Sequence, residues 1–380
     1  MILAFVTLSQ IEKIAIFLVV LSVLVVLHEY GHFLIARLNR VRVLEFAVGM
    51  GPKIVGWTSP RSGTLYSLRA LPIGGFCQMQ GEDGKTSEAE QQRDYRKGTV
   101  PADDNFQGKG AWQRLAIVAA GPVANFIVAF AILLLAGLVF GAANLNVSQP
   151  RIGQLIPGSS AARAGMQTGD RIVAVDGVAI AGGQQLITRI HASRGKLLHI
   201  AYAREGVART ADVRPAACPA TPPNNPKNGC IGFLPIPEYT HVAFGTAVRN
   251  AAYDFSDIAV QTVGSLALLV GHPQKYAPQM SGVVGMGQAA MTIQDFGWGY
   301  YLRFAALISF ALGLFNLLPI PALDGGRGAF IVAELFRGKP VDPEREALVH
   351  VTGFAVLIAL MIVINFYNVV RIVEGKGPFN

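Results

Sequence analysis

The sequence predicts an α-helical polytopic membrane protein with about four transmembrane helices, a membrane-associated β-rich loop and an inserted extracytoplasmic α+β domain. Of the 380 residues, 52% are hydrophobic and 15% are charged, whereas soluble proteins carry about 25% charged residues. The mean hydropathy is +0.41. Four apolar stretches also reach the length of about 20 residues that a helix needs to cross a bilayer.

These stretches divide the chain into segments. The predicted spans are Ile14–Ala36, Leu115–Phe140, Tyr301–Leu318 and Leu348–Val370. The first span is too long for the apolar core of a secretory signal, and it contains ionisable residues. The predicted segments are the first transmembrane helix (1–37), a cytoplasmic β-rich loop (38–114), the second transmembrane helix (115–141), a globular domain (149–215), an extracytoplasmic linker with an amphipathic helix (216–298), the third transmembrane helix with a proline-containing turn (299–347), and the fourth transmembrane helix with the C-terminus (348–380).

The loop between the first and second spans begins with strand-forming sequence. Residues 41–82, "VRVLEFAVGMGPKIVGWTSPRSGTLYSLRALPIGGFCQMQGE", are rich in β-formers and are interrupted by Gly, Pro and Ser. This pattern indicates short strands joined by turns. The strands form either a small subdomain of the loop or a β-structure at the membrane surface beside the first helix.

The domain at 149–215 contains "IGQLIPGSSAARAGMQTGDRIVAVDGVAI", in which short β-rich runs alternate with a small-residue helix and tight Gly-Asp and Asp-Gly turns. The pattern resembles a bacterial PDZ domain. Residues 231–270, "IGFLPIPEYTHVAFGTAVRNAAYDFSDIAVQTVGSLALLV", predict an amphipathic helix along the membrane surface. A re-entrant segment is the alternative for its more apolar part.

Basic residues near the ends of spans predict the orientation, because cytoplasmic loops are enriched in Lys and Arg. The 38–114 loop and the end of the first span carry Arg37, Arg40, Arg42, Lys109 and Arg114. We therefore expect the 38–114 loop in the cytoplasm and the globular domain outside it. The formal net charge of +8 fits such loops, and no Lys/Arg-rich run or nucleic-acid-binding signature is present, so nucleic acid is not an expected partner.

The three cysteines support the same orientation. Cys218 and Cys230 flank the loop "CPATPPNNPKNGC", and Cys77 stands far away in the predicted cytoplasmic loop. An oxidising compartment would allow Cys218 and Cys230 to form a disulfide while Cys77 stays reduced. Two free thiols are the alternative.

The first span contains "HEYGH", which predicts metal chemistry. His28 and His32 are four residues apart, so on a helix they lie on one face and reach the same zinc ion. Glu29 follows the first histidine and can act as the general base toward an attacking water. Ionisable residues are costly in a bilayer and usually mark function, so a fortuitous match is a poor explanation.

A catalytic zinc needs a third protein ligand and one open position. In "FNLLPIPALDGGR", Asp324 follows an apolar helix that Pro319 and Pro321 interrupt. Non-helical backbone at membrane depth is tolerated where it is buried in protein or lines a wet cavity. We expect Asp324 to be the third ligand; capping of the helix that follows is the alternative.

Together, HEYGH and the N-x-x-P-x-P-x-x-D-G pattern from Asn316 to Gly325 resemble the site-2 protease family of intramembrane zinc metalloproteases. The position of HEYGH, the PDZ-like insert and the four-span layout resemble the bacterial regulator of sigma-E protease subgroup. The segments "GPVANF", "GGFCQMQGE" and "MSGVVGM" fit as well. The chain departs from the better-known members of the subgroup in having room for one PDZ domain instead of two.

The resemblance implies that His28, His32 and Asp324 bind one catalytic Zn²⁺ and that Glu29 is the base. It also implies that Asn316 contacts the substrate backbone; a hydrogen bond to a neighbouring helix is its alternative. Asn125 in "GPVANF" has the same two interpretations. We further expect the segment from Gly74 and Gly75 to Glu82 to form a loop whose edge pairs with an unwound substrate by strand addition.

The expected function is the cutting of single-span membrane proteins after an earlier trimming cut, in a bacterial inner membrane and near its cytoplasmic side. Anti-sigma factors and remnant signal peptides are the implied substrates. The PDZ-like domain either binds a new C-terminus or excludes bulky ectodomains. A non-catalytic scaffold or sensor with a structural zinc is the main alternative, and a transporter is a weaker one because the halves show no repeat.

Overall fold

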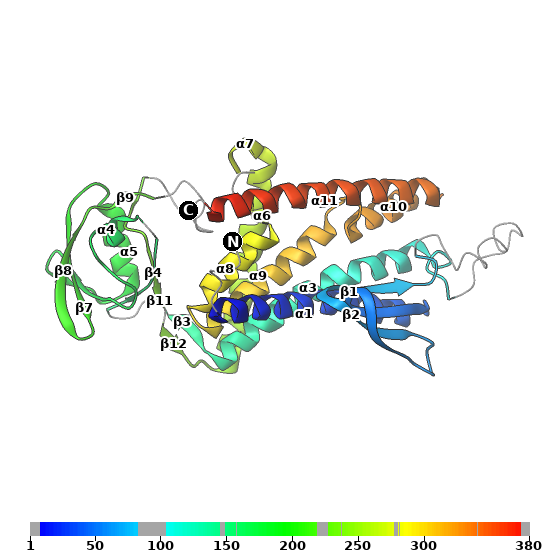
Figure 1. The fold of residues 1–380 in the computed structure, drawn as a ribbon, viewed down its shortest axis with the longest axis horizontal. Helices are drawn as coiled ribbons and strands as arrows, with labels where there is room; N and C mark the ends of the chain where they lie inside the picture. The colour runs from blue at the N-terminus through cyan, green and yellow to red at the C-terminus, as the bar shows by residue number, and fades with distance from the viewer. Residues whose placement is uncertain are drawn as a thin grey trace, which may run out of the picture. The chain divides into compact units, whose positions relative to one another are not determined.

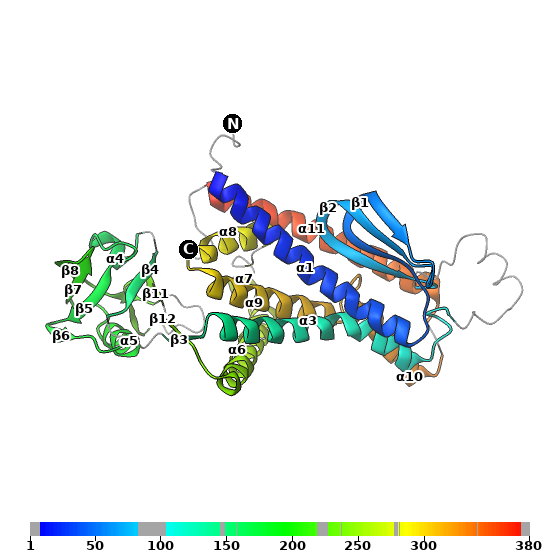
Figure 2. The ribbon, with the colours of Figure 1, turned by 90° about the horizontal axis from the view of Figure 1, so that it is seen from below.

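The computed structural model describes residues 8–82, 104–144, 149–156, 158–218, 227–236, 238–276, 280, 282–339 and 341–373. The chain divides into two compact units, which are described separately. The first unit contains Met1–Leu135 and Ala251–Pro378, and the second contains Ala136–Asn250. Figures 1 and 2 show the elements of both units from two directions.

Four helices in the described part of the chain are long and apolar enough to cross a membrane, as predicted. They are α1 (Leu8–Leu38), α3 (Ala111–Val139), α9 (Trp298–Leu317) and α11 (Pro343–Val373). Most of them extend a few residues beyond the predicted spans, because polar residues continue the helices past the apolar stretches. The helix α9 ends early because Leu318, which precedes Pro319, has an extended backbone (φ −67°, ψ 144°).

Close packing joins these helices in the first unit. A Cβ atom on Gly31 of α1 would lie 2.7 Å from the Cβ of Ala124 in α3, so only glycine permits this approach. Ser309 of α9 donates a 2.9 Å hydrogen bond to the carbonyl of Asn125 in α3. Apolar clusters fill the remaining space, with Phe17, Leu24 and Tyr301 in one of them.

Three further helices of the described residues lie wholly in the first unit. These are α7 (Pro273–Tyr276), α8 (Val283–Gln294) and α10 (Asp324–Arg337). The segment "MSGVVGM" leads into α8. The ion pair between Lys13 and Asp295 and a hydrogen bond from Gln294 to the Lys13 carbonyl join the end of α8 to the start of α1.

The first loop contains two long strands, β1 (Val43–Thr58) and β2 (Leu65–Met79), which confirms the predicted β-structure. The sequence predicted a loop from Gly74 to Glu82. That prediction is wrong for its first part, because Gly74 and Gly75 lie within β2. Residues 45–48 of β1 have partners on both sides, at 75–78 and at 65–68. Residues 75–79 therefore form an edge, since 43–48 are their only strand partners among the described residues.

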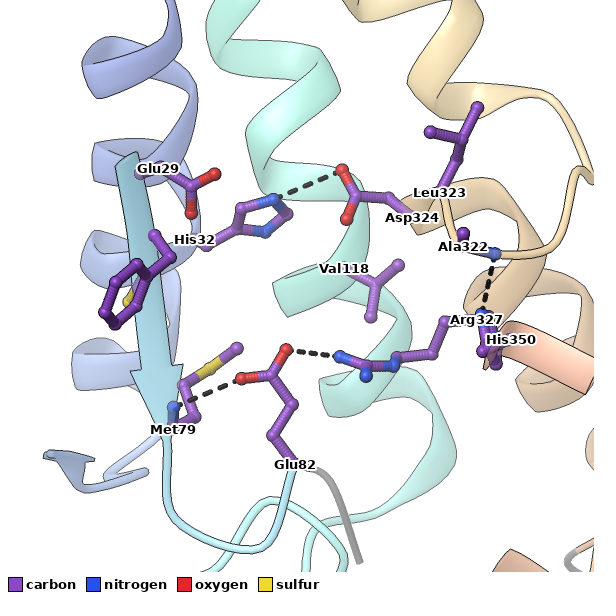
Figure 3. A pocket seen from close by; sticks show the side chains of 12 residues that line it. Glu29, His32, Met79, Glu82, Val118, Ala322, Leu323, Asp324, Arg327 and His350 are labelled. Carbon is purple, nitrogen blue, oxygen red and sulfur yellow. Dashed lines mark hydrogen bonds and ion pairs between the residues drawn. The ribbon is translucent and has the colours of Figure 1, made fainter. Parts of the chain in front are cut away.

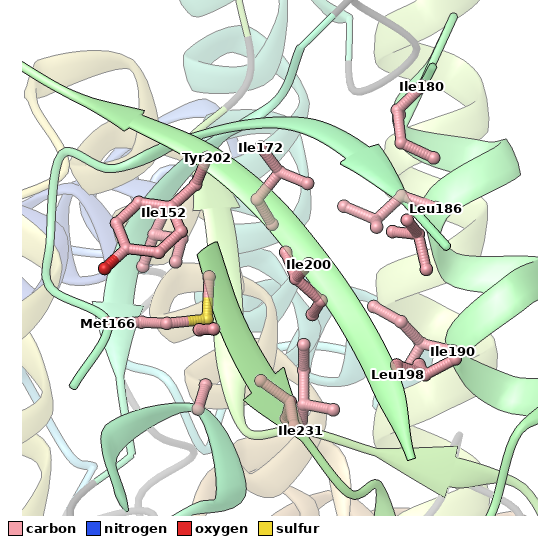
Figure 4. Packing of buried hydrophobic residues seen from close by; sticks show 14 residues of the cluster. Ile152, Met166, Ile172, Ile180, Leu186, Ile190, Leu198, Ile200, Tyr202 and Ile231 are labelled. Carbon is pink, nitrogen blue, oxygen red and sulfur yellow. The ribbon is translucent and has the colours of Figure 1, made fainter. Parts of the chain in front are cut away.

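The second unit contains a globular module built on one sheet, with strand order β11-β4-β5-β7-β8 and β6 paired with β5. The elements are β4 (Arg151–Leu155), α4 (Ser160–Arg163), β5 (Arg171–Val175), β6 (Val178–Ala179), α5 (Gly183–Ala192), β7 (Leu198–Arg204), β8 (Val207–Val213) and β11 (Phe233–Ile236). The predicted boundary at 215 is too early, because β11 pairs with β4. Fourteen buried residues form its core, including Ile152, Ile172 and Ile200 (Figure 4).

Polar contacts complete the module. The Asp170 side chain is fully buried and receives hydrogen bonds from the Arg204 guanidinium at 2.7 and 2.8 Å. Burial alone would raise the pKa of Asp170, but the Arg204 hydrogen bonds and the Gln167 N–H together hold that pKa below its usual value. After β9 (Ala216–Ala217), Cys218 forms a disulfide with Cys230 in β10 (Gly229–Cys230).

The amphipathic helix predicted for 231–270 begins later than expected. Its first part forms the strands β11 and β12 (Glu238–Thr240), and the helix α6 runs from Phe244 to Gly271. The strand β12 pairs with β3 (Ala142–Asn144). Pairing with distant strands overrides the local helix signal here, because strand formation depends on tertiary partners more than on propensity.

Candidate metal centre

Two buried histidines on α1 face the same space. His28 and His32 are each 6% exposed and lie one helical turn apart. Gly121 of α3 packs against both rings, because a Cβ on it would lie 2.7 Å from the Cε1 atom of each. Glycine at this position lets α3 approach the two imidazoles.

Asp324 reaches the histidines from the turn between α9 and α10. The N-cap of α10 is Leu323, and Asp324 is the first helical residue. Its side chain points at the imidazoles and does not cap the helix, so the structure favours the ligand interpretation over capping. Gly326 allows the turn to be tight, since a Cβ there would lie 2.9 Å from the carbonyl carbon of Ile320.

Three donor atoms converge at this point. The Oδ2 atom of Asp324 lies 3.1 Å from His28 Nε2 and 3.2 Å from His32 Nε2, and the two Nε2 atoms are 3.3 Å apart. Tetrahedral zinc with ligand atoms about 2.0–2.1 Å away keeps neighbouring ligand atoms about 3.3 Å apart. The spacing of the three atoms therefore fits one zinc ion.

The hydrogen bond at Nδ1 of each imidazole decides whether its Nε2 atom has a lone pair for a metal ion. His32 Nδ1 donates a 2.8 Å hydrogen bond to the carbonyl of Ile117, so the lone pair of His32 is on Nε2. Asn125 is fully buried, and its amide lies 3.1 Å from His28 Nδ1. The atom placed at that distance is Asn125 Nδ2, while Asn125 Oδ1 has no partner among the described residues. The two ends of an amide are interchangeable at such a contact. Turning the amide over gives Oδ1 the proton of His28 Nδ1–H and leaves the lone pair of His28 on Nε2.

When Nδ1–H donates on both rings, the two Nε2 lone pairs and the Asp324 carboxylate point at one centre. Two neutral imidazoles and one carboxylate are a ligand set that suits zinc. Asn125 thus contacts His28 and can orient its ring. Its predicted contact with the substrate backbone stays a prediction, because Asn125 also lines a cavity beside the centre.

Glu29 lies between two cavities that meet at the metal centre. The first has a volume of about 240 Å³ and is lined by Glu29, His32 and Asp324 together with Phe76, Cys77 and Met79 of β2. Figure 3 shows this cavity with α1 on one side and the turn before α10 on the other. Burial raises the pKa of the Cys77 thiol in its wall.

The second cavity, of about 220 Å³, lies on the other side of Glu29. Asn316 and Asn125 line it with His28 and Asp324. Asn316 thus lines a cavity beside the metal centre, and its contact with the substrate backbone stays a prediction. Gly75 is also near, because a Cβ on it would lie 3.8 Å from Cγ of Glu29. Gly74 packs against Met50 of β1 instead: its φ is +81°, and a Cβ on it would lie 3.3 Å from Met50 Sδ.

An ion pair that the sequence did not suggest lies in the wall of the first cavity. Arg327 of α10 pairs with Glu82, whose other carboxylate oxygen accepts a 3.1 Å hydrogen bond from the Met79 N–H. This contact ties the end of β2 to α10, as Figure 3 shows. Glu82 stood in a motif already noted, but its partner is 245 residues away and no local pattern indicates the pairing.

Comparison with protein-family models matches residues 16–360 to Peptidase family M50. The chain belongs to this family. As a member of the site-2 protease family, it is an intramembrane zinc metalloprotease, and zinc is its cofactor. These statements agree with the residues at the centre, which offer two imidazoles, one carboxylate and an adjacent glutamate.

Individual relatives match most of the chain. A protein of Rhizobium meliloti named as a zinc metalloprotease is 33% identical over 358 residues, covering 91% of this chain and 93% of its own. The zinc metalloprotease RasP of Geobacillus kaustophilus is 28% identical, covering 95% and 98%. The regulator of sigma-W protease RasP of Bacillus subtilis is 29% identical, covering 94% and 98%.

A solved structure also matches part of the chain. The PDZ domain of an SdrC-like protein from Listeria monocytogenes is 22% identical, covering 23% of this chain and 88% of its own, with a TM-score of 0.21. At this score the match does not establish the fold of the module.

Proposed function

We propose that this M50 peptidase cuts transmembrane segments of single-span membrane proteins that another protease has already trimmed. The observation that carries the proposal is the convergence of Asp324 with His28 and His32 of α1, a helix apolar enough to cross a membrane that also carries Glu29. The relative named as a regulator of sigma-W protease supports anti-sigma factors as one class of substrate. Remnant signal peptides, which are also single apolar segments, are the second class.

His28, His32 and Asp324 would hold the zinc, which as a Lewis acid makes water a better nucleophile and polarises the scissile carbonyl. Three protein ligands with cavities beside them leave an open position, whereas structural zinc sites are closed by four ligands. This argues against the scaffold with a structural zinc. Glu29 borders both cavities, so its carboxylate can take a proton from water on one side and deliver it to the leaving amine on the other.

The proposed location is the bacterial cytoplasmic membrane, with the centre near the cytoplasmic side. His32 precedes Arg37 by five residues, or about 8 Å along the helix. A basic residue so close to the end of a span favours the cytoplasmic boundary. The module would then lie outside the cytoplasm, where the disulfide between Cys218 and Cys230 is stable.

The surface of the β1–β2 sheet supports contact with the lipid. Several large apolar side chains on it are more than half exposed, including Met50, Ile54, Val55, Trp57 and Leu71. An exposed apolar patch of this kind marks an interaction site in a soluble environment. Ile54 and Val55 are neighbours in the strand and point to opposite faces, and residues 50–58 of β1 are exposed throughout. We therefore place this end of the sheet, and not one of its faces, against the membrane.

Residues 75–79, at the edge of the sheet, are the proposed binding site for an unwound substrate. Their strand partners lie on one side only, and Phe76 and Cys77 line the cavity that contains Glu29. A substrate strand added at this edge would place its peptide bonds beside the centre. Asn316, across the second cavity, would contact the substrate backbone near the cut.

Native Cys77 provides a test of this strand addition. In a Glu29→Gln background, single cysteines are placed along the substrate segment and oxidised to cross-link with Cys77. Strand addition predicts cross-links at alternate substrate positions, with none in Cys77→Ala. Cross-links at every third or fourth position would instead mean that a helix is bound, and would contradict the proposal.

The module has two proposed roles, a peptide groove and a size filter. Because β11 belongs to the sheet, a deletion that tests them should remove residues 149–236 and not stop at 215. Cleavage of untrimmed substrates by the deleted protein would support the filter. Weaker binding of trimmed substrates would support the groove.

The central experiment co-expresses a tagged anti-sigma-type substrate with the wild-type protein or with Glu29→Gln. The proposal predicts near-complete loss of cleavage by Glu29→Gln with unchanged zinc content. Normal function of Glu29→Gln would favour a scaffold or sensor and overturn the proposed mechanism.

A further inference from the structure

The helix α11 contacts the turn that carries Asp324. His350 of α11 accepts a 2.9 Å hydrogen bond at Nδ1 from the backbone N–H of Ala322. Figure 3 shows this bond at the edge of the first cavity. Ala322 is two residues before Asp324, so the bond lies between α11 and a metal ligand.

Ala322 has an unusual backbone conformation. Its φ is +76°, in the left-handed region that residues other than glycine rarely adopt. Such a conformation persists only where the surrounding structure holds it. The preceding residue, Pro321, cannot donate a backbone hydrogen bond, which leaves the Ala322 N–H as the donor available at this point of the turn.

A second contact lies one helical turn further along α11. A Cβ on Gly353 would lie 3.0 Å from the carbonyl carbon and oxygen of Pro321. Glycine at this position therefore lets α11 touch the turn directly. Together, His350 and Gly353 hold two consecutive residues of the turn, Pro321 and Ala322.

The surroundings of His350 fix the orientation of its ring. The Phe330 ring lies beside it, with the ring centroids 5.7 Å apart. The Glu346 carboxylate is 3.9 Å from Nε2 on the opposite edge. The imidazole is thus confined, and Nδ1 is the atom that faces the turn.

We propose that His350 is a positioning residue for the third metal ligand. Its Nδ1 atom holds Ala322 at positive φ, and Ala322 in turn aims Asp324 at the two histidines. The inference rests on the proposed role of Asp324 as a zinc ligand. His350 touches neither the substrate nor the reacting atoms, so its effect is on metal binding first and on cleavage as a consequence.

Three substitutions at position 350 distinguish this role from a general contribution to folding. His350→Asn keeps an acceptor at the position of Nδ1, His350→Gln moves the amide to the position of Nε2, and His350→Leu removes the acceptor. The purified full-length variants in detergent are stripped with a chelator and titrated with Zn²⁺. Loss of a group that orients a ligand lowers metal affinity about 10- to 100-fold.

We expect that loss for His350→Leu and His350→Gln, and zinc affinity within about threefold of wild type for His350→Asn. A further variant tests the route through the backbone. Since glycine tolerates positive φ, Ala322→Gly should make the turn less dependent on His350. The affinity lost on adding His350→Leu should be smaller in the Ala322→Gly background.

The inference is overturned if all three variants bind zinc as tightly as the wild type does. It is also overturned if His350→Asn, His350→Gln and His350→Leu lose zinc affinity by the same factor. A control separates this failure from that of the proposed function. Should Asp324→Asn bind zinc as wild type does, the ligand assignment itself fails. If Asp324→Asn loses zinc while His350→Leu and His350→Gln retain it, only the role of His350 is refuted.

Discussion

Replacing Gly121 by alanine should disable the metal centre by moving both histidines. The added methyl would lie 2.7 Å from Cε1 of His28 and of His32. Carbon atoms in contact are about 3.5–4.0 Å apart, so the rings or α3 must move by about 1 Å. Zinc–ligand distances are held within about 0.2 Å, which is much less than this displacement.

The expected effect of Gly121→Ala on zinc affinity is at least the 10- to 100-fold that misoriented ligands cause. This corresponds to about 1.4–2.7 kcal/mol of zinc binding free energy. Alanine favours a helix over glycine by about 1 kcal/mol, so loss of α3 does not explain the effect. Cleavage should fall together with zinc content.

The assay measures zinc per protein and cleavage of a tagged single-span substrate after purification in detergent. Gly137→Ala is the matched control, because it lies on the same helix and its Cβ would be 3.8 Å from the Cβ of Ala247, an ordinary contact. It should keep zinc and activity. Wild-type zinc affinity and cleavage in Gly121→Ala would refute the close packing described for α3.

Three other expectations can be measured. Asn125→Leu removes the acceptor for His28 Nδ1–H, so zinc affinity should fall about 10- to 100-fold, while Asn125→Asp should retain most of it; equal affinity in both would contradict the orienting role. Reduction of the Cys218–Cys230 disulfide, which closes a loop with a sequence separation of 12, should destabilise the module by about 3 kcal/mol, seen as faster hydrogen exchange in its sheet. Asp170 has a lowered pKa in the folded state, so its stabilising contribution is present above the unfolded pKa and is lost as the pH falls through the folded value. The protection factors of the wild-type module, which are its exchange rates corrected for the intrinsic pH dependence of amide exchange, should therefore fall below about pH 4. Arg204→Met should have lower protection factors at pH 7 already; unchanged protection in Arg204→Met would contradict the pairing.

The first part of the metal centre could be predicted because its information is local. His28, Glu29 and His32 lie within five residues, and helix geometry alone places the two imidazoles on one face. A separate motif identified Asp324 as a ligand candidate, but the direction of its side chain could not be predicted from that motif. A shift of one residue in the start of α10 would make it an N-cap instead of a ligand, and packing of the turn against α11 decides between the two.

Single hydrogen bonds between residues that are far apart in the sequence could not be predicted. The bond between Ala322 and His350 joins residues 28 apart. Ala322 stands at an unspecified position of the motif from Asn316 to Gly325, and His350 belongs to no motif. The sequence of β11 was likewise interpreted as helix, since its partner β4 is about 80 residues away and only tertiary pairing makes it a strand. Composition and hydropathy, by contrast, suffice for the four apolar helices.

The pairing of β3 with β12 has a consequence for the architecture of the chain. The strand that leaves α3 and the strand that returns toward α6 are neighbours through Ala142–Asn144 and Glu238–Thr240, and paired strands lie about 4.8 Å apart. The chain between these two strands is therefore an insertion whose two ends are held side by side by the strand pair. Because the entry and the exit of this segment are adjacent, replacing it need not separate the end of α3 from the start of α6.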